Sequence, residues 1–567
     1  MYKSSDDKIF FKDQRMDQTI KRQERKISPY RIVEVSIILV FLAASIVTAV
    51  LAAPLQQQGI IETADPGSLE AVISYMPVQG WTPLQVYFSA DDSYSRNGRI
   101  IKYEWDLDGN GRFDTDATET GGYASYNYLD NGNYDVALRI TDEKGYTSTA
   151  SVPVNIRHPG SSSVDYWTVF DDRRVRKVTV RLKQSDWDHV WSDIESKYEV
   201  PADAVIFGEE LKDIGFSMRG QFSMRESGAK KPWKINTDAF IADQEFHNLK
   251  QLVFTNNIGD STMLMEKLSY DMMHFAGVPA SHVCFVEFWI DISDDNKDPM
   301  FWGVYTMIER IDAKFISNRF GRDAKDGNRY KASHAQRGPM DLVYYGESIE
   351  DYPTQNGQYA YGKDNNLEDP DYSDVIELCY KVDGEEYDSP DEFAEALEEV
   401  FNIDSFLRYM AVISLTMNWD SYPWTGNNFF LFNNPVTGKF EWVPWDLTWG
   451  GDASMPLFER SQPTVSPYAP LFENVFKVEK YRRQYSAYMD LLIKEFFNYD
   501  NIYRVSMDYH QMIAPYVTQE SGDRMYFGET AWFTIEEFND SWQDLARIAG
   551  ERASYVENKL NDQLSNN

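Results

Sequence analysis

A run of 22 residues, from 32 to 53, separates a short N-terminal segment from the rest of the chain. The run is mostly apolar and contains one acid, Glu34, near its start. A helix of this length, at about 1.5 Å per residue, spans the roughly 30 Å hydrocarbon core of a bilayer. Nine Lys or Arg residues lie within residues 1–31, and none follows until Arg96. Because the basic side of a membrane span stays cytoplasmic, the pattern predicts a single-pass transmembrane helix with a basic cytoplasmic tail and the bulk of the chain outside the cytoplasm.

A cleaved signal peptide is the competing interpretation of the same run. The sequence TAVLAAP, residues 48–54, offers small residues of the kind found at a cleavage site. The preceding basic region and the apolar run are both longer than those of a usual signal peptide. We therefore expect an uncleaved anchor, followed by a linker at residues 54–66.

Length and composition limit the kinds of domain that can follow the linker. A chain of 567 residues is too long for one core and predicts several domains. Hydrophobic residues make up 43% of it, enough for most of it to fold. The net charge of −35 argues against nucleic acid as a partner, because binding the phosphate backbone needs basic patches. The two cysteines, Cys284 and Cys379, are too few for a disulfide scaffold or zinc site, and we expect two buried thiols rather than a bridge.

Residues 67–159 carry short alternating apolar runs separated by turn clusters, the pattern of an all-β sandwich. Within them TPLQVYFSADDS, IIKYEWDLDGNG and YNYLDNGNYDVALRITDEKG resemble the PKD domain. That resemblance implies an immunoglobulin-like sandwich, usually a spacer or binding module of extracellular proteins. From the residues alone, we expect Trp105 to be a core residue.

One loop of this sandwich resembles the first part of an EF-type calcium loop. Its oxygen-bearing side chains are spaced as such a loop requires, but Ala117 stands where the bidentate Glu is expected. The alternative is an Asx turn that satisfies backbone groups between two strands. The candidate Ca²⁺ ligands are Asp106, Asp108, Asn110 and Asp114.

Residues 164–567 mix strand and helix patterns and predict an α+β domain. Within residues 417–451, the runs FFLF and FEWV flank the turn NNPVTGK and predict a β-hairpin. The hairpin would bring Asp446 toward Asp420 and the amides Asn427 and Asn428. Carboxylate and amide oxygens suit Mg²⁺, and phosphoryl transfer needs such a set.

The order of the charged residues in this domain follows the protein-kinase template, although GxGxxG, HRD and DFG motifs are absent. The segments MRGQFSMR…KKPWKI, MLMEKLSYDMM…GVPA, FWGVYTMIERID, NWDSY…NNFFLF and VPWDLTWGG resemble the CotH family of atypical protein kinases, related to a spore-coat protein. The resemblance implies a kinase-like fold, ATP with Mg²⁺ or Mn²⁺, and transfer of phosphate to protein Ser or Thr hydroxyls.

The resemblance also implies roles for individual residues. Arg219 and Lys234 would contact phosphates, Glu266 would pair with Lys234, and Glu309 would lie near the nucleotide base. Asp420 would orient the acceptor hydroxyl. The metal would be held by Asp446 together with Asn427 or Asn428.

One departure from the family pattern supports a second hypothesis. Where members often read Arg-Gly-Asn-Ser, this chain reads Arg-Gly-Gln-Phe at residues 219–222, so a bulky ring stands where a loop would approach phosphates. We expect a membrane-anchored kinase that acts on a protein substrate at the cell surface. The alternative is a non-catalytic surface or envelope assembly protein, or an adhesion protein, that uses a kinase-like scaffold.

Overall fold

A computed structural model describes residues 69–566, apart from positions 82, 97, 158–164, 227, 229, 451, 461–467 and 520–532. The predicted tail, transmembrane helix and linker, residues 1–66, lie outside the described residues. Within the described part of the chain, no helix is both long and apolar enough to cross a membrane.

The N-terminal domain is the predicted β-sandwich. Its larger sheet has the order β3-β10-β9-β6-β7, and a three-stranded sheet has the order β2-β4-β8. Trp105 is fully buried in the core, and its indole nitrogen donates to the carbonyl of Gly122 at 3.1 Å. The strands are β1 (Leu69–Glu70), β2 (Ser74–Met76), β3 (Gln79–Trp81), β4 (Leu84–Ser89), β5 (Tyr94–Ser95), β6 (Ile100–Asp106), β7 (Thr115–Asp116), β8 (Ala124–Tyr128), β9 (Gly132–Asp142) and β10 (Thr147–Arg157).

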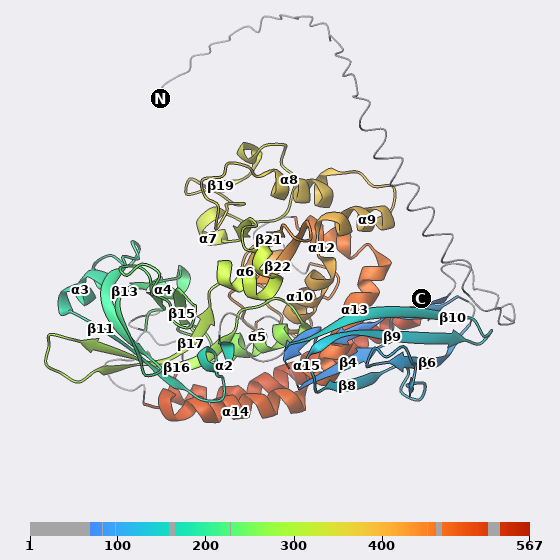
Figure 1. Cartoon of the computed structure of the whole chain (residues 1–567), viewed down its shortest axis with the longest axis horizontal. Coiled ribbons are helices and arrows are strands. Elements are labelled where there is room, and N and C mark those ends of the chain that lie inside the picture. The colour runs from blue at the N-terminus through green and yellow to red at the C-terminus, as the bar shows by residue number, and fades with distance from the viewer. Residues whose placement is uncertain are drawn as a thin grey trace, which may run out of the picture. The chain divides into compact units, whose positions relative to one another are not determined.

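A closed seven-stranded barrel follows, with the order β11-β12-β13-β14-β15-β17-β16; its strands are coloured green in Figure 1. The barrel closes through the parallel pairing of β11 with β16, and aromatic side chains such as Phe216, Trp233 and Phe288 fill it. The strands are β11 (Arg176–Leu182), β12 (Val200–Ile206), β13 (Glu209–Met218), β14 (Trp233–Asn236), β15 (Gln251–Thr255), β16 (Val283–Ile292) and β17 (Met300–Glu309).

Short helices connect and flank the barrel strands. Helix α5 ends at Gly277, which adopts the left-handed conformation with φ of 80° and caps the last turn. Both cysteines, Cys284 and Cys379, are buried free thiols, as expected. The helices of this region are α2 (Tyr166–Val169), α3 (Gln184–Ser192), α4 (Phe222–Glu226), α5 (Met265–Ala276), α6 (Ala313–Phe320), η1 (Arg322–Ala324), α7 (His334–Arg337) and η2 (Ile349–Asp351).

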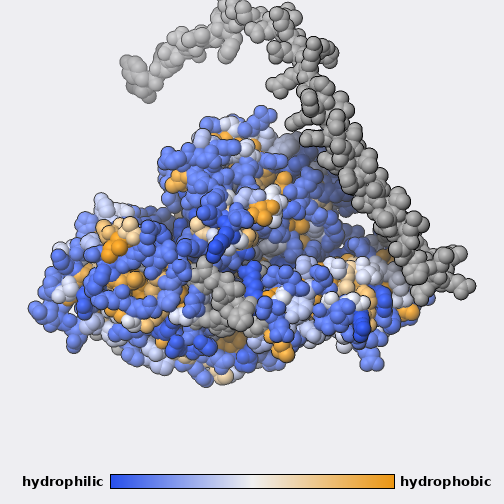
Figure 2. Space-filling view, in the orientation of Figure 1, coloured by the Kyte–Doolittle hydropathy of each residue, from blue (hydrophilic) through white to orange (hydrophobic). Residues whose placement is uncertain are grey.

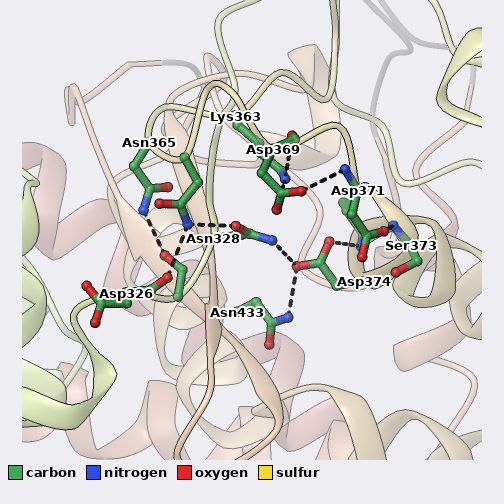
Figure 3. Close-up of polar contacts among 12 residues, drawn as sticks. Asp326, Asn328, Lys363, Asn365, Asp369, Asp371, Ser373, Asp374 and Asn433 are labelled. Atoms are coloured by element: carbon green, nitrogen blue, oxygen red, sulfur yellow. Dashed lines mark hydrogen bonds and ion pairs between the residues drawn. The ribbon is translucent and has the colours of Figure 1, made fainter.

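The predicted hairpin is present as β21 (Phe429–Asn434) and β22 (Lys439–Pro444), and β18 (Arg329–Lys331) extends it to three strands. A polar insertion with the small ribbon β19 (Thr354–Gln355) and β20 (Gln358–Tyr359) is tied to this sheet. Figure 3 shows Asn328 and Asn433 pointing at the carboxylate of Asp374, to which they donate at 3.0 and 2.8 Å. The Asn365 side chain accepts from the Arg329 amide at 2.7 Å. These bonds fix the edge strand β18 beside the hairpin.

Helices dominate the rest of the chain. Helix α10 is buried along nearly its whole length and leads into the loop before the hairpin, and α14 packs against β17 of the barrel. The face of the molecule in Figure 2 is mostly hydrophilic, with small scattered apolar patches, as expected for so charged a chain. The helices are α8 (Ser373–Cys379), η3 (Tyr380–Gly384), α9 (Pro390–Val400), α10 (Ile403–Leu415), α11 (Tyr422–Thr425), α12 (Pro470–Val475), α13 (Glu479–Glu495), α14 (Tyr499–Val517) and α15 (Ile535–Asn566).

Candidate active site

The hairpin places the second acid next to the asparagine pair. Phe429 pairs with Pro444 in the ladder, and the amide of Trp445 donates to the carbonyl of Asn428 at 3.1 Å. Asn428 and Asp446 therefore lie next to each other at the open end of the hairpin. Both adopt left-handed backbone conformations, with φ of 63° and 54°. Such conformations are uncommon for residues other than glycine and cluster at functional sites.

The first acid, Asp420, is held by side chains of the same loop. The hydroxyl of Thr425 donates to it at 2.9 Å, and the amide of Asn427 donates at 3.2 and 3.3 Å. The amide of Asn428 donates to the carboxylate at 2.9 Å and to the backbone carbonyl at 3.0 Å. These bonds fix the orientation of the carboxylate.

The structure distinguishes the two asparagines that the sequence left equivalent. Asn427 uses both ends of its side chain, since its oxygen accepts from the amide of His334 at 3.0 Å. Asn428 donates through its nitrogen to Asp420, and no donor within the described residues meets its oxygen. The free oxygen of Asn428 and the adjacent Asp446 carboxylate are therefore the better metal ligands.

Asp446 lies in a mixed field of charges. Its side chain is exposed to solvent. Nearby protein atoms still displace part of its hydration, so desolvation raises the pKa of Asp446, and the charge of Asp420 raises it further. Arg219 and Lys331 act in the opposite direction and lower its pKa. The two acids and the two cations are thus close enough to influence one another.

Glu266 on α5 belongs to the same cluster. One of its carboxylate oxygens accepts from the hydroxyl of Thr255 at 2.7 Å, while the other is buried and, among the described residues, has no hydrogen-bond partner. Burial raises the pKa of Glu266 to about 8, and the neighbouring Asp446 contributes to the increase. A buried acceptor without a donor needs an explanation, and a ligand or metal ion between Glu266 and Asp446 would supply one.

Lys234 does not take part in this cluster, so the predicted Lys234–Glu266 pair is wrong. Lys234 pairs with Glu199 at 2.5 Å. Side chains alternate along a strand: Trp233 and Ile235 of β14 point into the barrel core, which leaves Lys234 on the outer face. There it shares Glu199 with Asn236, whose amide donates at 3.1 Å.

Two other cations, Arg219 and Lys331, lie near Asp446. The guanidinium of Arg219 and the ammonium of Lys331 each lie 5.7 Å from the ring centre of Trp445, the residue before Asp446. Burial lowers the pKa of Lys331 to about 7, and the positive charge of Arg310 contributes. No sequence motif points to Lys331, so it was not among the predicted site residues. Only the pairing of β18 with β21, where Lys331 faces Phe430, brings it to the site.

Glu309 also differs from its expected role beside a nucleotide base. Its buried carboxylate accepts from the hydroxyl of Tyr166, the backbone amide of His282 and the guanidinium of Arg319. Arg319 is itself nearly buried. The structure therefore uses Glu309 to join α2 and α6 to the end of β17, and leaves it little capacity for a ligand.

In the sandwich, the predicted calcium loop has the geometry of the Asx turn that was its alternative. The buried Asp106 accepts from the amides of Asn110 at 3.1 Å and Gly111 at 2.7 Å. The Asp108 carboxylate accepts from the Asn110 amide at 3.2 Å. Across the described part of the chain, no group of three or more His, Cys, Asp or Glu side chains is arranged to hold a metal. Calcium binding by Asp106, Asp108, Asn110 and Asp114 stays a prediction without geometric support.

Comparisons with known proteins agree with both domains. A family model described as "CotH kinase protein" matches residues 216–556, and a PKD domain model matches residues 77–156. Inner spore coat protein H of Bacillus subtilis is 21% identical over 344 residues, which cover 60% of this chain and 84% of that protein. Invasin CotH3 of Rhizopus delemar is 21% identical over 370 residues, 61% of this chain and 57% of that protein.

Among solved structures, the PKD1 domain of the Vibrio cholerae metalloprotease PrtV is 27% identical, with a TM-score of 0.13. The match covers 16% of this chain and 96% of that domain. The CotH model spans more than half of the chain and contains the hairpin, α5 and the barrel strands from β14 onward. The protein is a member of the CotH kinase family that carries a PKD domain before its CotH domain.

Proposed function

We propose that this chain is a metal-dependent phosphotransferase that moves the γ-phosphate of ATP to Ser or Thr hydroxyls of a protein. The observation that carries the proposal is the convergence of Asp420, Asn428 and Asp446 with the cations Arg219 and Lys331. Two acids, an amide and two cations match the parts needed to position a triphosphate and an acceptor hydroxyl.

The donor set fits Mg²⁺ or Mn²⁺. Asp446 offers a solvent-reachable carboxylate and Asn428 a free amide oxygen, and Mg²⁺ is usually bound by one or two protein oxygens together with substrate phosphates. The metal would neutralise the charge that develops on the phosphates. Glu266, whose second carboxylate oxygen has no partner among the described residues, would be a further oxygen donor near Asp446.

The protein residues then have distinct tasks. Arg219 and Lys331 would bind the phosphates from the side of Trp445. Asp420, held by three side-chain donors, would orient the acceptor hydroxyl and take its proton as the oxygen bonds to the γ-phosphorus. The bond from that phosphorus to the bridging oxygen breaks in the same step, and ADP leaves.

We also propose that the chemistry takes place outside the cytoplasm, on a chain anchored by residues 32–53. The apolar run and the asymmetry of Lys and Arg on its two sides support this placement.

Phosphotransfer from labelled ATP tests the enzyme directly. The full-length chain, purified in detergent with Mg²⁺ or Mn²⁺, should transfer label to itself or to a Ser-rich protein. Asp446→Asn should abolish the transfer without lowering the melting temperature. No transfer with either metal would contradict the proposal.

A non-catalytic role in surface assembly is the second candidate. Its support is Phe222, which is 60% exposed at the start of α4, just after the loop that carries Arg219. Two relatives are named as a spore coat protein and an invasin. On this account, Asp420→Asn combined with Asp446→Asn would leave surface attachment intact, and loss of attachment in a folded double variant would reject it.

A further inference from the structure

A cavity of about 1490 Å³ lies where the end of β10, the C-terminal end of α5 and helix α6 meet. None of the candidate active-site residues lines it. Sites for drug-sized ligands usually measure about 300–1,000 Å³. The cavity is therefore large enough for a segment of polypeptide.

The charge of the cavity is opposite to that of the whole chain. The chain has 90 acidic and 55 basic residues, whereas the lining has more basic than acidic side chains. The two lining imidazoles add no charge near neutrality, because burial lowers the pKa of His274 to about 3 and that of His282 well below its usual value. The charged lining residues are the basic Arg157, Lys314, Arg319, Arg322 and Lys325 and the acidic Asp271 and Asp323.

Some of these charges are already used inside the protein. Lys314 pairs with Glu245 at 3.4 Å and Arg319 with Glu309 at 2.7 Å. Asp271 pairs with the buried Lys267 at 2.5 Å, and Lys267 also pairs with Asp172 at 3.0 Å.

Three cations remain against one acid, Asp323. Arg157, Arg322 and Lys325 form no ion pair with any residue in the described part of the chain. Among the described residues, Arg157 donates to the carbonyl of Asn318 at 3.2 Å. Their positive charge is therefore available to an external anion.

An apolar wall accompanies these cations. A ligand that matches the cavity therefore carries both anionic and apolar side chains. Clusters of Arg recognise acidic and phosphorylated segments of polypeptides through charge-assisted hydrogen bonds. Nucleic acid fits poorly, because the chain's net charge of −35 repels a long polyanion. The apolar lining residues include Pro77, Pro83, Leu84, Phe275, Val278 and Phe496.

We propose that this cavity binds an acidic, partly apolar segment of a partner polypeptide. Its Asp or Glu carboxylates pair with Arg157, Arg322 and Lys325, and its apolar side chains pack on the wall around Phe275. Arg322 and Lys325 are exposed, and screening weakens exposed ion pairs. Binding therefore falls as salt is raised.

A fluorescein-labelled peptide of Glu and Leu, titrated with the full-length chain in detergent, tests the proposal by anisotropy. The same sequence with Gln in place of Glu is the control peptide. We expect Arg157→Glu and Arg322→Glu each to weaken binding of the Glu peptide by about tenfold or more, the effect of losing one charge-assisted bond. Arg482→Glu makes the same charge change on the exposed face of α13, outside the cavity lining, and should leave binding unchanged.

The outcomes separate this inference from the proposed function. Asp446→Asn should bind the Glu peptide normally whether or not the chain is a kinase. Equal binding of the Gln peptide, or unchanged binding in both cavity variants, would overturn the inference. So would complete displacement by inorganic phosphate at the same charge concentration, which would indicate a site for small anions. Binding of a phosphoserine peptide without binding of the Glu peptide would overturn it in favour of a phosphopeptide site.

Discussion

At the scale of single residues, sequence and structure differ most over which lysine would bind the phosphates. The sequence indicates Lys234, whereas the structure has Lys331 near Asp446. Lys331→Met should weaken ATP binding by about tenfold to a hundredfold, since a hydrogen bond to a charged group contributes roughly 1.5–3 kcal/mol. Lys234→Met breaks only the partly exposed pair with Glu199, a contact of about 1 kcal/mol or less, and should leave ATP affinity unchanged. Calorimetric titration of both variants with ATP and Mg²⁺ checks this. The reverse pattern would restore the sequence-based assignment of Lys234.

Gly277 makes a second residue-scale prediction, about contact between the two domains. A Cβ atom there would lie 2.0 Å from the Cγ2 atom of Val78 in the sandwich, and φ is 80°. Gly277→Ala should therefore lower the free energy of unfolding by roughly 2 kcal/mol or more. Gly259→Ala is the matched control, because its φ is 79° and no atom lies within 4 Å of the added methyl group.

Thermal unfolding of the two glycine variants separates the cost of backbone strain at positive φ from the cost of the steric clash with Val78. Gly259→Ala should show the smaller decrease in melting temperature, from backbone strain alone. Adding Val78→Ala to Gly277→Ala should recover part of the loss. Equal effects of the two glycine substitutions would mean that Val78 does not press on Gly277.

At the scale of elements, the sequence predicted what depends on local pattern. The alternating runs on either side of NNPVTGK predicted the hairpin β21–β22, and the alternating pattern of residues 67–159 predicted the sandwich with Trp105 in its core. The barrel closure could not be predicted, because β11 and β16 pair across about a hundred residues and long-range pairing leaves no local signal. The same limit explains why Lys331 was not predicted, because only the long-range pairing of β18 with β21 brings it to the site. Lys234 lies on the outer face because its neighbour Trp233 points into the barrel core.

The turn after β4 makes a pH prediction at this scale. Asp92 is buried there, and Ser74 donates to it at 3.3 Å. Burial raises the pKa of Asp92 to about 7, although Arg483 of α13 opposes the shift. A carboxyl whose folded pKa exceeds its unfolded value of about 4 stabilises the fold fully below pH 4, and that contribution is lost as the pH rises through 7.

Asp92→Asn should therefore flatten the fall in melting temperature between pH 4 and pH 8, and should raise the melting temperature relative to the wild type at pH 8. Asp130→Asn, at an exposed position of the same domain, is the control and should keep the wild-type slope. A wild-type slope in Asp92→Asn would show that this carboxyl stays ionised.

At the scale of the whole molecule, one buried arginine links the sandwich to the CotH domain. Arg408 of α10 pairs with Asp404 at 2.9 Å and donates to the carbonyls of Tyr75 in β2 at 2.7 Å and Ala276 at the end of α5 at 3.2 Å. Arg408→Met would leave buried carbonyls without donors. It should lower the free energy of unfolding by about 2–3 kcal/mol.

The loss of this link should also change the form of the unfolding transition. In differential scanning calorimetry, the wild type should give one transition for both domains and Arg408→Met two. A single transition at the wild-type temperature in the variant would show that other contacts join the domains.

The central claim is that Asp446 and Asn428 hold a metal ion on the phosphates of ATP, and calorimetric titration of the full-length chain with ATP and Mn²⁺ tests it most directly. The account predicts metal-dependent binding to the wild type. It predicts losses of about tenfold or more in Asp446→Asn and Asn428→Ala, with unchanged melting temperatures and no loss in Lys234→Met. ATP binding that is absent from the wild type, or that persists equally in Asp446→Asn, would contradict the account.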